Sequence, residues 1–313
     1  MAEAADYFVN PQVRRREADR PPPLSVWLWV AGVVAAIVAA TAVYFAFLAR
    51  PVNIPSDAAF FNAQMDRLER EEQAYRSSGQ RPLSIVFVGT SRMKNATFDP
   101  AQVARSAKAF GIQRPVASTY LAINWGGFER LQPAVKRLLE DRPDVVVVMP
   151  ELFVEDFNYR ARARLGFRHL QGKVWSQDYK LFGDSEFYEP ACSGFHTIED
   201  RIADHRSWIS DSTGSRGPAM AREAVRQLTS AGTRVLIADV PTSAAMTAKR
   251  PAPTEQKFLR DAQLPQAAHT IWLGQPLPNS AYCDWAHVDP KNAAIWQQAF
   301  FSRAAGDLNA IGR

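Results

Sequence analysis

The tetrapeptide Gly89-Thr90-Ser91-Arg92 places a serine directly after a compact apolar stretch, residues 83–89. A short, β-rich apolar run that ends in glycine predicts a buried strand. A serine at the turn into the next helix lies beside N–H groups that have no partner within that helix. Those donors can stabilise an oxyanion, so Ser91 is a candidate nucleophile. The alternative is an ordinary strand-to-helix turn in which the serine caps the helix.

A second motif, Asp284-Trp285-Ala286-His287, precedes the last helical segment. Its spacing brings a carboxylate and an imidazole to the same side of a turn. The carboxylate can fix the tautomer of the ring, which leaves the other ring nitrogen to take a proton from a hydroxyl. A surface ion pair is the alternative. Together with Ser91, this pair would supply a nucleophile, a base and a group that orients the base.

Alternating strands and helices must position these motifs. Fully apolar strands that alternate with helices predict a parallel sheet covered on both faces, and sites in such sheets lie at the carboxyl ends of the strands. The expected fold class is therefore α/β, with a three-layer, flavodoxin-like arrangement. Strands are predicted at 83–89, 117–123, 144–149 and 233–240, and helices at 56–78, 100–110, 128–139, 218–230 and 291–308.

A long aromatic segment, residues 150–217, leaves the third predicted strand and has weak periodicity. Segments of this length are usually functional or have structure of their own. We expect it to form an inserted cap over the carboxyl edge of the sheet.

Residues 24–49 contain no charged side chain. A helix of this length measures about 39 Å, against roughly 30 Å of membrane hydrocarbon. The positive-inside rule predicts a single-pass anchor in the inner membrane, with a cytoplasmic tail (residues 1–23) and a periplasmic or otherwise extracytoplasmic domain. A cleaved signal peptide is the alternative. A juxtamembrane helix (50–80) and an α/β domain (81–313) would follow. Arginines precede the segment at positions 14, 15, 16 and 20, and only Arg50 follows closely.

The composition excludes several classes of protein. Of 313 residues, 47% are hydrophobic, so the chain can bury a large core. The net charge of +5 comes without an arginine-rich helix, so no nucleic-acid partner is expected. Two cysteines, Cys192 and Cys283, can form one disulfide outside the cytoplasm or remain two buried thiols. No cofactor or metal is expected, because the histidines outside the motif lack metal-ligand spacing: His169, His196, His205 and His269.

Three motifs together resemble the SGNH/GDSL hydrolase superfamily over about residues 83–310: G-T-S-R after the first strand, N-x-G after the second, and D-x-x-H before the last helix. More narrowly, the chain is similar to membrane-anchored bacterial members such as alginate O-acetyltransferases and the D-alanyl transfer proteins of teichoic acid. The resemblance implies that Ser91 is the nucleophile, His287 the base and Asp284 its orienting group. It also implies that Gly126, in the motif that begins at Asn124, donates its N–H to the oxyanion.

The third motif of the superfamily, G-x-N-D, is replaced here by Met149-Pro150-Glu151-Leu152. An ionised carboxylate at the place of an amide donor repels an oxyanion. Either Glu151 is turned away or protonated, or Asn158 supplies the donor, or only two backbone donors remain.

Beside the nucleophile, Arg92 is a candidate to hold an anionic substrate. The alternative is a pair with a nearby acid such as Asp99.

The resemblance implies a membrane-anchored serine esterase or O-acyltransferase that acts on acyl esters, acetyl above all, of an exopolysaccharide or cell-envelope glycan. Its partners would be the glycan, the membrane and a membrane acyltransferase or synthase complex. The competing hypothesis, favoured by Glu151, is a catalytically inactive subunit that binds glycan or serves as a scaffold in polysaccharide synthesis.

Overall fold

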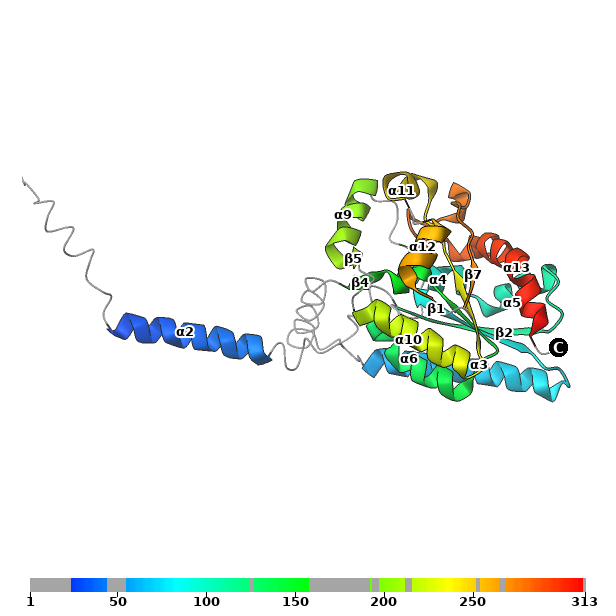
Figure 1. Ribbon diagram of the computed structural model, residues 1–313, viewed down its shortest axis with the longest axis horizontal. Helices are drawn as coiled ribbons and strands as arrows, with labels where there is room; N and C mark the ends of the chain where they lie inside the picture. Colours follow the sequence, from blue (N-terminus) through cyan, green and yellow to red (C-terminus); the bar gives the residue numbers. More distant parts are fainter. Residues whose placement is uncertain are drawn as a thin grey trace, which may run out of the picture. The chain divides into compact units, whose positions relative to one another are not determined.

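The computed structural model describes residues 24–43, 55–123, 127–157, 192, 197–211, 216–251, 254–264 and 268–311. The chain divides into two compact units, Met1–Arg50 and Pro51–Arg313 (Figure 1). The second unit holds both motifs that could do chemistry.

In the first unit, the described residues form one helix, α2 (Leu24–Val43). It contains no charged residue, and it is long and apolar enough to cross a membrane. A signal sequence near an N-terminus has the same properties, so the helix by itself does not define a topology.

The second unit is built on a five-stranded, all-parallel sheet with the order β2-β1-β3-β6-β7. The four strands predicted from apolar runs are confirmed as β1, β2, β3 and β6. The edge strand β7 was not predicted, because it has only three residues; among the described strands it pairs with β6 alone. The strands are β1 (Leu83–Thr90), β2 (Val116–Ile123), β3 (Val145–Val148), β6 (Arg234–Ala238) and β7 (His269–Ile271).

Helices cover both faces of this sheet (Figure 1). One layer contains α3 (Pro55–Ser77), α6 (Phe128–Asp141) and α10 (Arg216–Ser230). The other contains α4 (Ser91–Ala96), α5 (Pro100–Ala109) and α13 (Ala293–Ala310). The helix predicted over residues 56–78 is confirmed as α3. It packs against β2 and α6, with Phe60, Phe61, Met65 and Leu68 buried.

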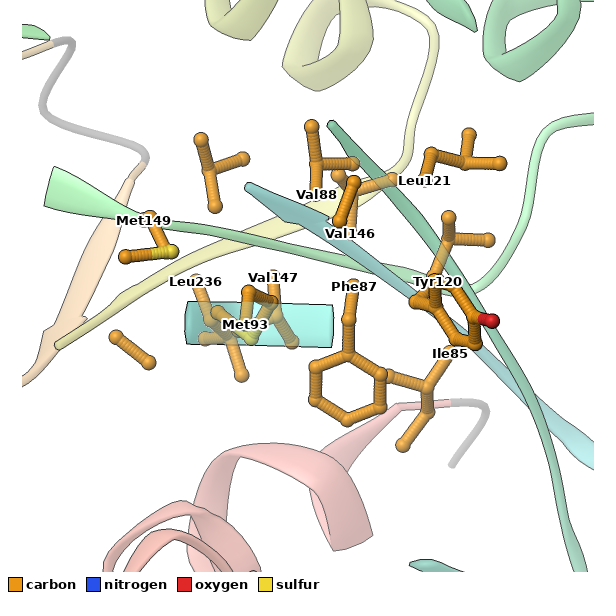
Figure 2. Packing of buried hydrophobic residues seen from close by; sticks show 14 of the residues in the cluster. Ile85, Phe87, Val88, Met93, Tyr120, Leu121, Val146, Val147, Met149 and Leu236 are labelled. Atoms are coloured by element: carbon orange, nitrogen blue, oxygen red, sulfur yellow. The ribbon is translucent and has the colours of Figure 1, made fainter. Parts of the chain in front are cut away.

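Alternation of side chains along β1 divides the core between the two layers (Figure 2). Phe87 points toward α13, where its ring lies 6.2 Å from that of Trp296 and 5.9 Å from that of Phe300, measured between centroids. Val88 points to the opposite face of the sheet, as does Val146 of β3 (Figure 2). Both faces of the strand are therefore buried, which explains its continuous apolar sequence.

Shorter elements complete the second unit. The described part of the predicted cap contains the 3₁₀ turn η2 (Pro150–Phe153), helix α9 (Ile198–Trp208), and the antiparallel strands β4 (Glu155–Phe157) and β5 (Ile209–Asp211). Helices α11 (Ala244–Lys249) and α12 (Glu255–Ala262) and the 3₁₀ turns η3 (Asn279–Ala281) and η4 (Pro290–Asn292) lie between β6 and α13.

Candidate active site

Ser91 is the first residue of α4 and follows β1 without a loop. The side chain of Thr90 caps this helix by accepting the backbone N–H of Arg92 at 3.4 Å. Gly89 is required immediately before, because a Cβ atom there would lie 2.6 Å from Sδ of Met149 and 2.7 Å from Cβ of Met93. The turn therefore holds the Ser91 hydroxyl at the carboxyl edge of the sheet.

The motif with Asp284 and His287 lies in a closed loop between η3 and η4. Tyr282 and Val288 form an antiparallel bridge across its base, and the Cys283 N–H donates to the His287 carbonyl at 3.0 Å. Within the loop, Oδ1 of Asp284 accepts the backbone N–H groups of Ala286 and His287, each at 2.8 Å. These bonds fix the carboxylate in place.

Ser91, His287 and Asp284 form one hydrogen-bonded chain. Oγ of Ser91 lies 2.8 Å from Nε2 of His287, and Nδ1 of His287 lies 2.8 Å from Oδ2 of Asp284. The carboxylate requires the ring proton on Nδ1, so Nε2 is left to accept the serine proton. The structure thus brings together the three residues that the sequence predicted as a triad.

Burial and local hydrogen bonds shift the pKa of the Asp284 carboxyl in opposite directions. This residue is 1% exposed. Burial alone raises the pKa of this carboxyl. The hydrogen bond and charge of His287, with the two backbone N–H groups, outweigh burial and hold the pKa well below its usual range. Asp284 therefore stays ionised, as a group that orients and stabilises an imidazolium must.

A disulfide ties the described cap residue Cys192 to Cys283, the residue before Asp284. The buried amide of Asn95 donates to the Val288 carbonyl at 3.1 Å and to Sγ of Cys192 at 3.4 Å. Asn95 lies on α4, four residues after Ser91. Its contacts therefore join the helix that begins at Ser91 to the loop that carries Asp284 and His287.

Arg92 and Glu151 form an ion pair, with 2.5 Å between Nη1 and Oε1. Glu151 lies on η2, directly beyond β3, the neighbour of β1 in the sheet. Of the two alternatives for Arg92, the structure favours an acidic partner, but that partner is not Asp99, whose ion pair is with Arg105. Glu151 is therefore not an isolated charge.

The other predicted oxyanion residues, Asn124, Gly126 and Asn158, lie outside the described residues. Sequence reasoning missed Asn95 and Asp239. Asp239, 7% exposed, follows β6 and accepts the N–H groups of Leu273 and Gly274. The position of Asp239 directly after an apolar strand could have predicted a polar group at the carboxyl edge of the sheet. The sequence around Asn95 contains no comparable pattern.

No protein-family model, curated protein or solved structure matches this chain significantly.

Proposed function

We propose that the second unit is an SGNH-type serine esterase or O-acyltransferase that acts on acyl esters, acetyl above all, of an exopolysaccharide or cell-envelope glycan. The single observation that carries this proposal is the hydrogen-bonded chain Ser91–His287–Asp284. The sheet order supports it: with only the sheet strands numbered, the order is the flavodoxin-like 2-1-3-4-5.

In the proposed reaction, Ser91 Oγ attacks the ester carbonyl while its proton passes to Nε2 of His287. The tetrahedral intermediate collapses to an acyl-serine, and the imidazolium gives its proton to the departing alcohol. Water or a sugar hydroxyl then attacks the acyl-serine, losing its proton to His287, which finally reprotonates Oγ. Asp284 remains ionised throughout and stabilises the imidazolium.

The oxyanion would be held by the N–H groups of Ser91 and Gly126, of which only the first is described. An unpaired carboxylate at the position of Glu151 would repel the oxyanion. The Arg92 guanidinium balances the charge of Glu151, so the carboxylate does not oppose the stabilisation of the oxyanion in that way. A hydrolase or a transferase is compatible with this electrostatic balance.

The proposed location is the extracytoplasmic side of the inner membrane, with α2 as a single-pass anchor. The apolar helix and the disulfide support it together, because structural disulfides persist in oxidising compartments. A glycan that is exported past the membrane would meet the enzyme there.

The test uses the full-length chain in detergent, offered a chromogenic acetyl ester and a serine-directed fluorophosphonate. We expect turnover, and labelling at Ser91 identified by mass spectrometry of the modified peptide. Ser91→Ala should abolish both, whereas Ser302→Ala, an exposed serine on α13, should change neither. If the parent chain shows neither turnover nor labelling, the proposed enzymatic activity is contradicted, and the glycan-binding or scaffold role remains.

A further inference from the structure

The Arg92–Glu151 ion pair lies next to the nucleophile and at the ends of two neighbouring strands. Arg92 follows Ser91 on α4, and Glu151 lies on η2 after β3. The side chain of Arg92 is 18% exposed and that of Glu151 is 20% exposed. The pair is therefore at the edge of the site rather than in the core or fully in solvent.

Each member of this pair has a buried polar atom without a hydrogen-bond partner among the described residues. These atoms are Nε of Arg92, a donor, and Oε2 of Glu151, an acceptor. A buried donor or acceptor that lacks a partner costs about 1–3 kcal/mol, so native proteins rarely leave two of them on one ion pair. One group that both accepts and donates a hydrogen bond would satisfy both atoms.

Charge restricts what that group can be. A carboxylate would accept from Nε but would be repelled by Glu151 and could not donate to Oε2. An ammonium would donate to Oε2 but would be repelled by Arg92 and could not accept from Nε. A neutral hydroxyl can do both.

The ion pair also affects titratable groups at the carboxyl edge of the sheet and in the loop that carries Asp284. Burial is the main cause that raises the pKa of Tyr282, and the charge of Arg92 opposes it. Burial likewise raises the pKa of Asp239; backbone N–H groups lower it, Glu151 raises it further, and Arg92 lowers it. The pair therefore interacts electrostatically with the end of β6 and with the loop that carries Asp284.

We propose that Arg92 and Glu151 together form a specificity-determining subsite for an uncharged sugar hydroxyl of the acyl acceptor. The subsite selects neutral saccharide units over uronates and amino sugars. Its assignment to the acceptor rests on the proposed acyl chemistry, whereas its preference for a neutral hydroxyl rests only on the ion pair and its two unpartnered atoms.

Binding is measured on full-length Ser91→Ala in detergent, so that no turnover is needed. The probes are three methyl glucosides that carry a hydroxyl, a carboxylate or an amine on the same ring carbon, followed by ligand-observed NMR. We expect the hydroxyl probe to bind about tenfold more tightly than either charged probe, the difference that one well-made hydrogen bond to a charged group provides.

Two charge variants in the same background sharpen the test. Glu151→Gln should shift the preference toward the carboxylate probe, and Arg92→Gln toward the amine probe. Preferences are compared within each variant, so differences in the amount of folded protein cancel. If a variant does not fold, by circular dichroism, the ranking in the parent background decides alone.

Equal or tighter binding of a charged probe in the parent background would overturn the subsite, and so would an unchanged ranking in both folded charge variants. These outcomes are separate from the failure of the proposed function. Loss of esterase activity with the expected ranking would leave a neutral glycan-binding site, whereas activity without the ranking would leave an enzyme with a different subsite.

Discussion

Oγ of Ser91 lies 2.8 Å from Nε2 of His287, although 196 positions separate the two residues in the sequence. One belongs to the helix after the first strand and the other to the loop before the last helix. Parallel strands end at the same edge of the sheet, which is why residues from opposite ends of the domain meet there. This contact makes the triad testable residue by residue.

Substitutions in the triad should show unequal and non-additive effects on ester turnover. Ser91→Ala and His287→Gln should each lower kcat by about 10⁶, and Asp284→Asn by about 10⁴, because the last leaves the nucleophile and base in place but favours the wrong tautomer. The double variant Ser91→Ala/His287→Gln should be no slower than Ser91→Ala. Steady-state release of the alcohol from a chromogenic ester measures these rates, and effects that multiply would contradict a triad that acts as one unit.

Removal of the disulfide should lower stability. Cys192 and Cys283 are 91 positions apart, and a cross-link that closes a loop of this size stabilises by about 4.6 kcal/mol in the chain-entropy description. We expect Cys192→Ala/Cys283→Ala to lose about that amount in denaturant unfolding. A reductant should bring the parent chain to the level of this variant and leave the variant unchanged. An equal response of both proteins to the reductant would show that the disulfide does not stabilise the fold.

Acid should destabilise the fold through Asp284. Its pKa in the folded state lies below the usual 3.8, so its contribution to stability is complete above pH 3.8 and is lost as pH falls toward the folded value. Asp284→Asn removes this group, so its free energy of unfolding should fall less between pH 5 and pH 2 (about the range in which carboxyls titrate). Urea titrations across this range measure the difference, and parallel curves for the two proteins would contradict the assignment.

Two glycine substitutions should have opposite effects on stability. Gly89→Ala forces a Cβ to within 2.7 Å of Cβ of Met93, an atom held by the backbone of α4, so it should cost about 1–3 kcal/mol. Gly306 lies in α13, and a Cβ there would meet nothing within 4 Å beyond its chain neighbours and the backbone of its own helix, so Gly306→Ala should stabilise by about 0.5–1 kcal/mol. Thermal unfolding distinguishes them, and a neutral Gly89→Ala would mean that Met93 and Met149 yield without cost.

Local sequence patterns determined the elements of the domain. Apolar runs predicted four of the sheet strands, because a strand buried on both faces has no polar position. The observed boundary of a helix differs from the predicted one where a turn precedes the helix. The last helix, predicted from residue 291, begins at Ala293 because Pro290–Asn292 first form a 3₁₀ turn. The Asp284–His287 contact was also predictable, since three positions in one turn suffice to make it.

The sequence by itself therefore determined the α/β class, the apolar N-terminal helix and the candidate nucleophile and base. Only the tertiary structure decided that Ser91 meets His287, that Arg92 pairs with Glu151 across 59 positions, and that Cys192 bonds to Cys283. The physical reason is that periodicity and capping act over a few residues, whereas these contacts depend on the order and register in which the strands pair.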